Sequence, residues 1–579
     1  MIDAFPILAE INPGLWVILA GIIAALIPAG IARKALAITA PIFAAVLIFN
    51  LYDSTEVLAG QFSVLGVEFT TLRIDNLSVV WGYLFCLAGL INAIYALHEE
   101  SWITDSSALI YTGAAIAGVL SGDLLSLFLF WELTAISSVF LVWQGGDRAY
   151  HAGIRYLVIQ VLSGVLLLAG AVMFAASKGG DFTFGYIGLD APGGWLLLIA
   201  MGMKAGFPML HMWMQDAYPK ASITGTVILA SFTTKFAIYA LARGFPGTDI
   251  LIWIGCIMTM FPVFFAVVEN DLRRVLAYSL NNQLGFMVAG IGIGTTLAMN
   301  GVVGQVFVHV IFKGLLFMSI GAVMYRTGTA KASELGGLFR SMPYTTILCL
   351  IGAGSIAAFP LLAAFVTKAM ILSAALEEHL WLPFAMMLFA SAGVMEHSGI
   401  KVPHFTFFAH DSGRRVKEAP WNMLVAMSLA AILCIALAWP WGGYDILYSI
   451  MPYPTDYKPY TWDHVVFQLQ LLFAAIFAFT LLKRYKLYPA ERRAEIIDLD
   501  ILYRKVGKHI AIWIDAIWSR LSVQMSALRV KAARSVGQRL YHAFSPAGAL
   551  SQAAPSGLAS VLTAIVLILV LIFAYVAGR

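Results

Sequence analysis

Charged residues are scarce in this chain: Asp, Glu, Lys and Arg make up 12% of its 579 residues, whereas soluble domains carry about 25%. Hydrophobic residues make up 60% of the chain, and the mean hydropathy is +0.84. This composition excludes an ordinary soluble domain and predicts an all-α polytopic membrane protein. The formal net charge of +4 is too small to indicate nucleic acid binding.

Cysteine is also rare, with four residues that each stand alone in an apolar run. No two of them have metal-ligand spacing, and we expect no disulfide framework. The sequence GIGIG at 290–294 matches part of a dinucleotide-binding fingerprint. It lies inside an apolar run, however, so close helix packing is the better interpretation. We therefore expect no cofactor, no metal site and no redox centre in this chain.

Apolar runs of spanning length recur along most of the sequence. A membrane span needs about 20 apolar residues, which gives about sixteen spans here. Their approximate positions are 15–33, 35–51, 76–97, 105–122, 124–143, 153–176, 194–212, 222–244, 249–269, 273–295, 300–325, 343–373, 381–400, 420–441, 464–483 and 557–577. The N-terminus lacks the basic region of a cleavable signal, so we expect the first span to remain in the mature protein.

The distribution of Lys and Arg between the loops orients these spans. The loops on one side carry Arg33, Lys34, Arg148, Arg155, Lys220, Arg273, Arg274, Arg326, Lys331, Arg340, Lys401, Arg414, Arg415 and Lys417, and those on the other carry Arg73, Lys178, Arg243 and Lys458. The positive-inside rule places the richer side in the cytoplasm and the N-terminus outside. We expect a prokaryotic inner membrane protein whose charged tail, 485–556, is cytoplasmic.

Titratable side chains lie within or near the ends of several apolar runs. They are Glu132, Lys204, Lys235, Lys313 and Lys368. A charge at the centre of a span costs roughly 2.5–3.5 kcal/mol, and such residues usually mark an ion or proton path. A static buried pair or snorkelling lysines are the structural alternatives.

Two of the spans contain helix-breaking residues. Gly206 and Pro208 follow Lys204 within one turn, and the segment 352–360 interrupts the run that ends at Lys368. Paired broken helices indicate an inverted-repeat transporter, in which unwound backbone needs water or polar side chains. Both lysines are therefore expected to stay partly hydrated.

The chain becomes charged after residue 484. Apolar residues then recur at helical spacing, at Val506, Ile510, Trp513, Ile517, Leu521 and Leu528. This pattern predicts a long amphipathic helix along the membrane surface or along neighbouring subunits, with the final span as an anchor. A strut in a soluble helical bundle is the alternative.

Six segments together resemble one protein family. They are WELTAISS around Glu132, MKAGFPMLHMWMQDAYPKA around Lys204, TTKFAIYAL around Lys235, NDLRRVLAYSLNNQLGFM at 270–287, HVIFKGLLF at 309–317 and FPLLAAFVTK at 359–368. In this order they are similar to the antiporter-like subunits of respiratory complex I, Mrp-type cation/proton antiporters and membrane-bound hydrogenases. The resemblance covers about residues 70–440.

The resemblance implies a fourteen-helix core with two inverted five-helix repeats and broken helices, followed by a lateral helix and a terminal span. The corresponding segments are 1–104 (N-terminal helices), 105–245 (first repeat), 246–410 (second repeat), 411–484 (C-terminal core helices), 485–556 (lateral helix) and 557–579 (anchor). It also implies a proton relay. Glu132 and Lys204 match its pair, Lys235 the link between the halves, His309 and Lys313 the central step, and Lys368 the terminal lysine.

The sequence departs from the family pattern at three places. Gln305 stands where the family often has the first histidine of HxxxH, which removes a relay step or leaves it to water. The segment WMQDAYPKASITGTV at 213–227 differs from the family's usual loop. Glu396 and His397, in MEHSGIKVPHF, have no clear counterpart, and we interpret them as a second coupling pair or a cytoplasmic mouth.

These features predict a proton- or sodium-translocating subunit of a multisubunit Mrp-type cation/proton antiporter. The segment DLDILYR at 498–504 favours the D-type Mrp subunits. The long tail favours the alternative, a proton-pumping subunit of an NADH-quinone oxidoreductase or a membrane-bound hydrogenase. A stand-alone solute transporter and a structural scaffold are further alternatives. We expect partner membrane subunits docked in part by residues 485–579, the lipid bilayer, H⁺ and Na⁺.

Overall fold

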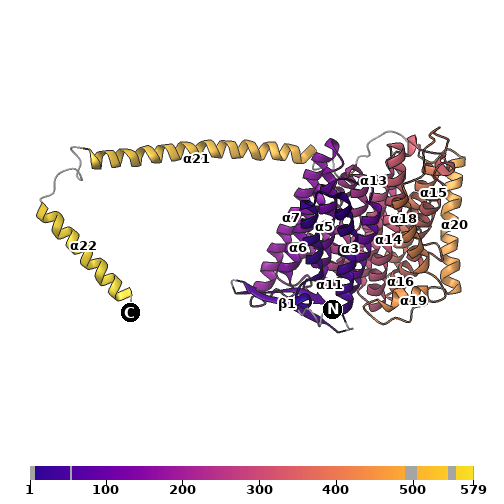
Figure 1. Cartoon of the computed structure of the whole chain (residues 1–579), viewed down its shortest axis with the longest axis horizontal. Coiled ribbons are helices and arrows are strands. Elements are labelled where there is room, and N and C mark those ends of the chain that lie inside the picture. Colours follow the sequence, from indigo (N-terminus) through magenta and orange to yellow (C-terminus); the bar gives the residue numbers. More distant parts are fainter. Residues whose placement is uncertain are drawn as a thin grey trace. The chain divides into compact units, whose positions relative to one another are not determined.

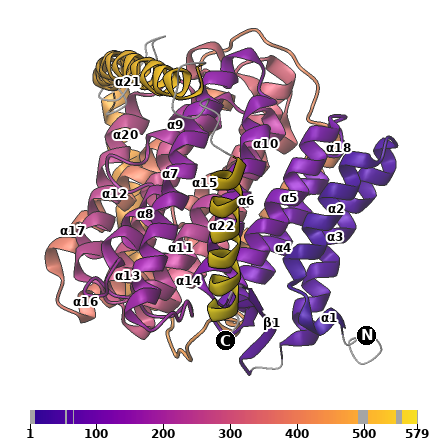
Figure 2. The same ribbon diagram turned by 90° about the vertical axis from the view of Figure 1, so that its left-hand side faces the viewer.

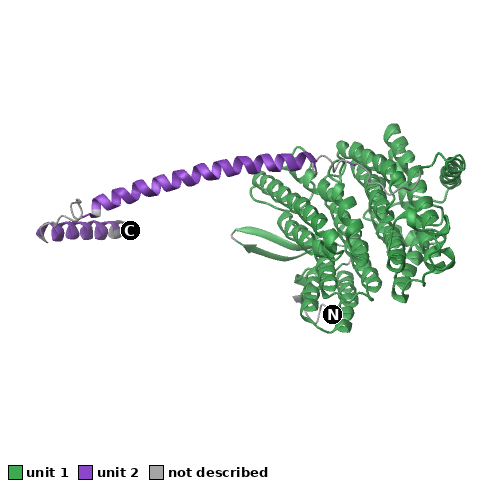
Figure 3. Ribbon diagram, turned by 90° about the horizontal axis from the view of Figure 1, so that it is seen from above, with its two compact units in different colours: residues 1–496 green, residues 497–579 purple. Residues whose placement is uncertain are grey.

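Apolar helices build almost the whole molecule. The computed structural model describes residues 7–52, 55–64, 66–489, 498, 505–545 and 556–577. Contacts divide the chain into two compact units, residues 1–496 and 497–579 (Figure 3). Within the described residues, eight helices are long and apolar enough to cross a membrane, and five apolar helices are shorter. The expected all-helical membrane fold is confirmed.

The first half of unit 1 contains a β-hairpin among its helices (Figure 1). Its elements are α1 (Ile7–Glu10), α2 (Pro13–Leu26), α3 (Gly30–Leu51), β1 (Val57–Val64), β2 (Val67–Ile74), α4 (Ser78–Tyr95), α5 (Trp102–Val119), α6 (Leu124–Trp143), α7 (Asp147–Ser177), α8 (Gly194–Ala205), α9 (Met212–Ala217), η2 (Tyr218–Lys220), α10 (Ile223–Leu229) and α11 (Thr233–Gly244). The two strands pair antiparallel, with Val57 opposite Ile74. The sequence patterns did not predict this hairpin.

The second half of unit 1 continues the bundle (Figure 2). Its elements are α12 (Asp249–Val268), α13 (Leu272–Ile293), α14 (Thr296–Thr327), η3 (Ala332–Glu334), η4 (Leu338–Arg340), α15 (Pro343–Ile356), α16 (Ala363–Glu377), α17 (Trp381–Val394), the π-helical η5 (Met395–Lys401) and η6 (His404–Phe408), α18 (Trp421–Ala436), α19 (Gly443–Ser449) and α20 (Trp462–Arg484). Unit 2 consists of α21 (Gly507–Phe544) and α22 (Ser556–Ala577).

Several expected span boundaries are corrected by the structure. The first span does not extend to residue 33, because α2 ends at Leu26, before Pro28, and the residue before a proline is driven out of helical geometry. The span expected at 222–244 is present as Ile223–Gly244, but it is built of two helices, α10 and α11. The span expected at 381–400 changes from α-helix to π-helix after Val394.

The expected break at Gly206 and Pro208 and the expected break within 352–360 are both present. The helix α8 ends at Ala205, and α9 begins only at Met212. Similarly, α15 ends at Ile356 and α16 begins at Ala363. The first break starts at Gly206, whose φ of +80° is a left-handed conformation that glycine adopts without a steric penalty.

Helices in unit 1 approach closely at small residues. A Cβ on Gly292 would lie 2.5 Å from the backbone nitrogen of Ile252 on α12, and one on Gly290 would lie 2.6 Å from Val302 on α14. Only glycine permits these approaches. These contacts agree with the interpretation of GIGIG as a motif for close helix packing.

The loops gather at two ends of unit 1. One end, which we call the basic end, carries most of the arginines of the loops and helix ends. Hydrogen bonds between side chains there join Arg33 to Asp105, Ser101 to Gln144 and Arg155 to Asp216. Three further arginines donate to backbone carbonyls: Arg273 to Ala221, Arg326 to Glu418 and Arg414 to Thr327. At the other, which we call the hairpin end, Arg73 bonds the carbonyl of Phe184, Asp123 accepts from Thr70, and Asn76 and Asn300 bond Pro452 and Tyr453. This separation agrees with the alternation of spans expected from the Lys and Arg distribution.

Candidate functional site

Glu132 lies on α6 and faces α7. The helix begins after Asp123, whose side chain accepts from the backbone N–H groups of Leu125 and Ser126. The Oε1 atom of Glu132 is buried, has no hydrogen-bond partner among the described residues, and lies 1.4 Å from the position that a Cβ on Gly164 would occupy. The carboxyl group therefore occupies space on α7 that exists because residue 164 is glycine.

Lys204 is buried in the last turn of α8, next to the break at Gly206. Its Nζ atom donates to the carbonyl of Trp131 at 2.5 Å and to Oγ1 of Thr134 at 3.1 Å, and lies 4.5 Å from the centre of the Trp131 ring. Among the described ion pairs there is none between Lys204 and Glu132. The two side chains therefore meet the same turn of α6, and the structure holds them in a separated arrangement.

Lys235 lies one turn after a third interruption, which the sequence did not predict. The helices α10 and α11 are separated by residues 230–232. The buried Nζ atom of Lys235 donates to the carbonyl of Ala230 at 2.5 Å. The lysine thus binds a carbonyl at the end of α10.

His309 and Lys313 lie one turn apart on α14, and both are buried. Neither ring nitrogen of His309, nor Nζ of Lys313, has a hydrogen-bond partner among the described residues. The His309 ring packs edge-on to Phe312, and Lys313 lies 5.7 Å from the centre of the Phe317 ring. Because the hydrogen-bonding capacity of both groups is unused, exchange with water or with each other requires no protein bond to break.

Lys368 lies two turns after the second break, on α16. Its buried Nζ atom is 3.5 Å from the carbonyl of Ile356, at the end of α15, and 3.5 Å from Oγ of Ser391. It also lies 4.8 Å from the centre of the Phe286 ring. Electrostatic interaction reaches His309 from Lys235, Lys313 and Lys368. We call the buried residues Lys204, Lys235, His309, Lys313 and Lys368 the row.

Gln305 belongs to a buried row of amides and hydroxyls that joins four helices. Along the row, Thr367 donates to Gln305 at 2.6 Å, Gln305 to Gln283 at 3.0 Å, Gln283 to Asn282 at 2.9 Å, and Asn282 to the carbonyl of Thr259. The row passes from α16 through α14 and α13 to α12. Sequence reasoning did not single out Asn282, Gln283 or Thr367, although the polar triplet NNQ in an apolar run was a signal.

Glu396 and His397 face different neighbours from the π-helical segment η5. Glu396 accepts from the hydroxyl of Tyr488 at 2.5 Å, beyond the end of α20. His397 is buried, and its Nδ1 is 2.9 Å from Ser398, whose hydroxyl donates to Ser279 on α13. The structure therefore does not bring the two together as a pair: one contacts the segment after α20, and the other lies in the bundle interior.

An ion cluster at the hairpin end fixes the chain around the site. Asp75 pairs with Arg243 at 2.8 Å and with Arg73 at 3.2 Å. Burial alone would raise the pKa of Asp75, but the charge and hydrogen bond of Arg243 outweigh it and hold the pKa at about 2. The carboxylate thus stays charged and links the segment after β2 to the end of α11.

Comparisons with known proteins found similar membrane proteins. Residues 121–395 match the family described as NADH:quinone oxidoreductase/Mrp antiporter, TM. The chain is 28% identical over 404 residues, 64% of its length, to the A/B component of a probable K(+)/H(+) antiporter of Rhizobium meliloti, strain 1021, of which it covers 40%. It is 33% identical over 291 residues, 46% of its length, to the D-type component of the Na(+)/H(+) antiporter of Alkalihalophilus pseudofirmus, of which it covers 58%.

A third relative and two solved structures extend the comparison. Hydrogenase-4 component B of Escherichia coli is 27% identical over 416 residues, which are 64% of this chain and 62% of that protein. The chain therefore spans less than two thirds of each of these three relatives. The fold matches a chain of the Mrp complex from Dietzia sp. DQ12-45-1b with a TM-score of 0.74 and 22% identity, over 90% of this chain and 62% of that one.

It also matches a chain of the membrane-bound sulfane sulfur reductase, an archaeal respiratory membrane complex, with a TM-score of 0.69 and 22% identity, over 96% of this chain and 99% of that one. These matches confirm the resemblance drawn from the six segments. This chain is a multi-pass membrane protein, and its residues 121–395 are similar to the membrane domain of the NADH:quinone oxidoreductase/Mrp antiporter family.

Proposed function

We propose that this chain is a proton-translocating membrane subunit of a multisubunit Mrp-type cation/proton antiporter. One observation carries the proposal: three buried lysines, Lys204, Lys235 and Lys368, each bond the end of a helix or lie beside a helix break. Carbonyls and hydroxyls, and not carboxylates, are their hydrogen-bond partners. Because these partners are neutral, no carboxylate holds the ammonium in its charged form, and it can release its proton and take one up again.

The row has a physical means of moving a proton. Burial favours the neutral amine, whereas an approaching carboxylate favours the charged one. In this arrangement Glu132 and Lys204 interact electrostatically without forming an ion pair. A side-chain movement that brings the two together shifts the balance by about 1.4 kcal/mol for each tenfold change in occupancy. Lys235, His309, Lys313 and Lys368 then pass the charge along the row.

The names of the relatives support both an antiporter and a redox-driven complex. Relatives named as components of Na(+)/H(+) and K(+)/H(+) antiporters favour the first. Relatives named as components of hydrogenase-4, of an F(420)H(2) dehydrogenase and of an NADH-quinone oxidoreductase support the second. The DLDILYR segment that favours the D-type subunits lies outside the described residues except for Asp498. We retain the Mrp-type assignment, with partner membrane subunits, H⁺ and Na⁺, in a prokaryotic inner membrane.

The direct test is cation/proton exchange in everted vesicles that hold the assembled complex. We expect Lys204→Ala, Lys235→Ala, Lys313→Ala and Lys368→Ala each to lower the rate at least about tenfold, which corresponds to about 1.4 kcal/mol in the barrier. Lys178→Ala is the matched control, because Lys178 is an exposed lysine at the end of α7 and should leave the rate unchanged. Transport that survives both Lys204→Ala and Glu132→Ala would overturn the proposal.

Purification of the tagged complex from native membranes decides between the two kinds of assembly. Small membrane subunits without flavin or iron–sulfur proteins would establish the cation/proton antiporter. Flavin, iron–sulfur or hydrogenase subunits in stoichiometric amounts would instead make this chain the pump module of a redox-driven complex.

A further inference from the structure

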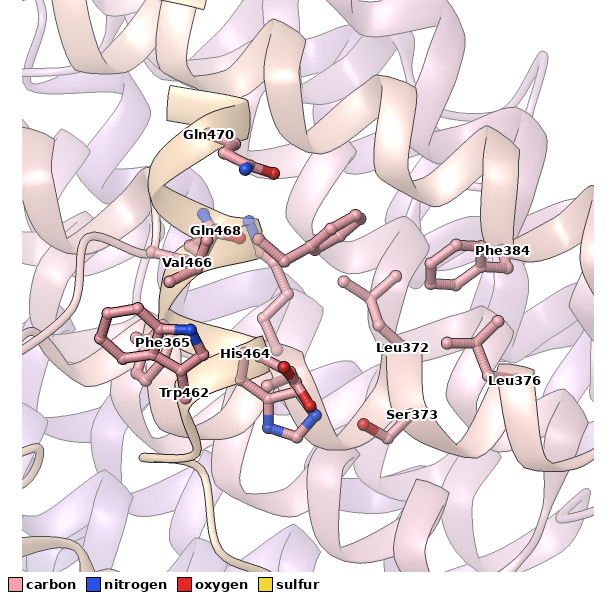
Figure 4. A pocket seen from close by; sticks show the side chains of 15 residues that line it. Phe365, Leu372, Ser373, Leu376, Phe384, Trp462, His464, Val466, Gln468 and Gln470 are labelled. Carbon is pink, nitrogen blue, oxygen red and sulfur yellow. The ribbon is translucent and has the colours of Figure 1, made fainter. Parts of the chain in front are cut away.

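The lysines beside the two predicted helix breaks have different surroundings. Lys368 borders a cavity of about 540 Å³ between α16, α17 and α20, whose lining is mostly apolar (Figure 4). Its Nζ atom has two hydrogen bonds, each of 3.5 Å. The Nζ atom of Lys204 has shorter hydrogen bonds, of 2.5 and 3.1 Å, to Trp131 and Thr134 on α6. The position of Lys204 therefore depends closely on how Trp131 is held.

Trp131 contacts Lys204 through its backbone and through its side chain. Its carbonyl accepts the 2.5 Å bond, and the centre of its ring lies 4.5 Å from Nζ. The face of an indole ring carries a negative electrostatic potential that attracts a cation at this distance, more strongly where water is excluded. Both residues are buried. The indole ring is thus a second partner for the ammonium, and it competes with the carboxyl group of Glu132.

The indole ring is fixed by Ser163 on α7. The N–H group of the ring donates to the Ser163 hydroxyl at 3.0 Å, and that hydroxyl donates to the carbonyl of Ala200 at 2.7 Å. Ala200 lies on α8, one turn before Lys204. The hydrogen bonds therefore form a closed loop from α8 to α6, from α6 to α7 and from α7 back to α8. The ring cannot turn away from the ammonium without leaving a buried N–H group unpaired, which is unfavourable.

The next residue on α7 acts on the other member of the pair. Gly164 leaves the space that the carboxyl group of Glu132 occupies. Ser163 and Gly164 are consecutive on α7, and the residues that they contact are consecutive on α6. A movement of α7 relative to α6 would therefore change the surroundings of both partners of Lys204 together.

We propose that Ser163 is a positioning residue for the proton step at Lys204. It holds the indole ring of Trp131 against the ammonium and thereby keeps Lys204 from pairing with Glu132. The inference rests on the proposed function, since it names what sets the balance of that pair. When the ring is anchored, the ring and the carbonyl of Trp131 stabilise the ammonium where it lies. When the anchor is removed, the ring turns and the ammonium moves to the carboxylate.

Ser163→Ala tests the proposal in the assembled complex, because it removes the hydroxyl and leaves the helix intact. In everted vesicles we expect the rate of cation/proton exchange to fall about fivefold, as for the loss of one hydrogen bond. Ser137→Ala is the matched control and should leave the rate unchanged. The Ser137 hydroxyl on α6 is also buried and donates to the carbonyl of Leu133 on its own helix, and it bonds no neighbouring helix among the described residues.

The structure of the Ser163→Ala complex, determined by cryo-electron microscopy, measures the position of Lys204 directly. We expect its Nζ atom within about 4 Å of a Glu132 carboxylate oxygen, the distance of an ion pair. Trp131→Phe removes the same hydrogen bond from the other side, keeps an aromatic face and should give the same arrangement. If Lys204 stays on the carbonyl of residue 131 in both variants, Ser163 does not position it and the proposal is wrong.

These measurements separate the inference from the proposed function. If Lys204 pairs with Glu132 in Ser163→Ala, but exchange is normal in that variant and in Lys204→Ala, then Ser163 positions the lysine and the proposed function fails. If Lys204→Ala abolishes exchange while Ser163→Ala leaves both the rate and the position of Lys204 unchanged, the proposed function stands and the positioning role fails.

Discussion

At the scale of single residues, the position of Glu132 depends on a residue that carries no side chain. The carboxyl group occupies space beside Gly164, where any Cβ would collide with Oε1. Glycine in a membrane helix usually serves close backbone packing, but here it admits an acidic side chain from the neighbouring helix. The identity of residue 164 therefore determines whether the carboxyl group of Glu132 can occupy its present position.

Gly164→Ala should move the carboxylate without unfolding the protein, because the atom that must shift is the end of a flexible side chain. We expect assembly to be normal and transport to change about as much as in Glu132→Gln. Gly314→Ala is the matched control: it lies on α14 beside Lys313, and the nearest atom to its new Cβ would be 4.0 Å away. Exchange rates in vesicles measure both. Equal rates for Gly164→Ala and the unmodified protein would show that the position of Glu132 is not decisive.

The titratable members of the row could be predicted from the sequence, whereas their partners could not. A lysine in an apolar run is conspicuous because a charge inside a membrane span costs free energy. As expected, the structure buries Lys204, Lys235, His309, Lys313 and Lys368 in the bundle interior. Their partners are carbonyls and hydroxyls from distant helices, which no local pattern reveals. The separated position of Glu132 is likewise a property of packing between α6 and α7.

At the scale of helices, the two interruptions with glycine and proline could be predicted, and the third could not. Residues 230–232 contain neither breaker, and distant tyrosines hold the gap open. Tyr218 donates to the carbonyl of Leu229 at 2.9 Å, and the N–H of Thr233 donates to the Tyr111 hydroxyl at 2.9 Å. Tertiary partners thus replace the intrahelical bonds, so helix propensity gives no warning. The π-helical η5 and the hairpin of β1 and β2 were also not predicted.

The row of amides through Gln305 should stabilise the packing of α12, α13, α14 and α16. Gln305→Leu leaves the buried side-chain oxygen of Gln283 unpaired and leaves Thr367 with only its 3.5 Å bond to the carbonyl of Ala364. An unpaired buried polar group costs about 1–3 kcal/mol, and we expect a lower midpoint of thermal unfolding of the purified complex. Gln160→Leu is the matched control. Gln160 on α7 is also buried but has no hydrogen-bond partner among the described residues, so its removal should leave the midpoint unchanged or raise it.

A third variant tests further whether the amide of Gln305 has a structural role. Gln305→His keeps a donor and an acceptor and restores the family's more frequent residue at this position. We expect it to retain more stability than Gln305→Leu. A midpoint for Gln305→Leu that equals that of Gln160→Leu would argue against a structural role for the amide row.

At the scale of the whole molecule, the boundary between the two units is a physical one. The segment that follows α20 still belongs to unit 1 and packs within it, since Tyr488 donates to Glu396 and packs against Phe405 and Phe479. Unit 2 begins at Ile497, and its helix α21 has 38 residues, or about 57 Å. Its apolar residues, Trp513 among them, are exposed within this chain. An apolar stripe of this length requires a membrane surface or partner subunits to cover it.

Removal of residues 497–579 should therefore impair assembly while leaving the core intact. The cut keeps Tyr488 and its contacts, so the thermal midpoint of unit 1 is expected to stay within a few degrees of that of the full chain, and affinity purification should recover it with fewer partner subunits. Removal of 557–579 alone keeps α21 and is the control: we expect it to retain more partners than the longer deletion. If the longer deletion assembles and transports like the full chain, unit 2 has no docking role. If instead the longer deletion lowers the thermal midpoint of unit 1 strongly, unit 2 stabilises the core. The division of the molecule into a self-sufficient core and a docking tail would then be wrong.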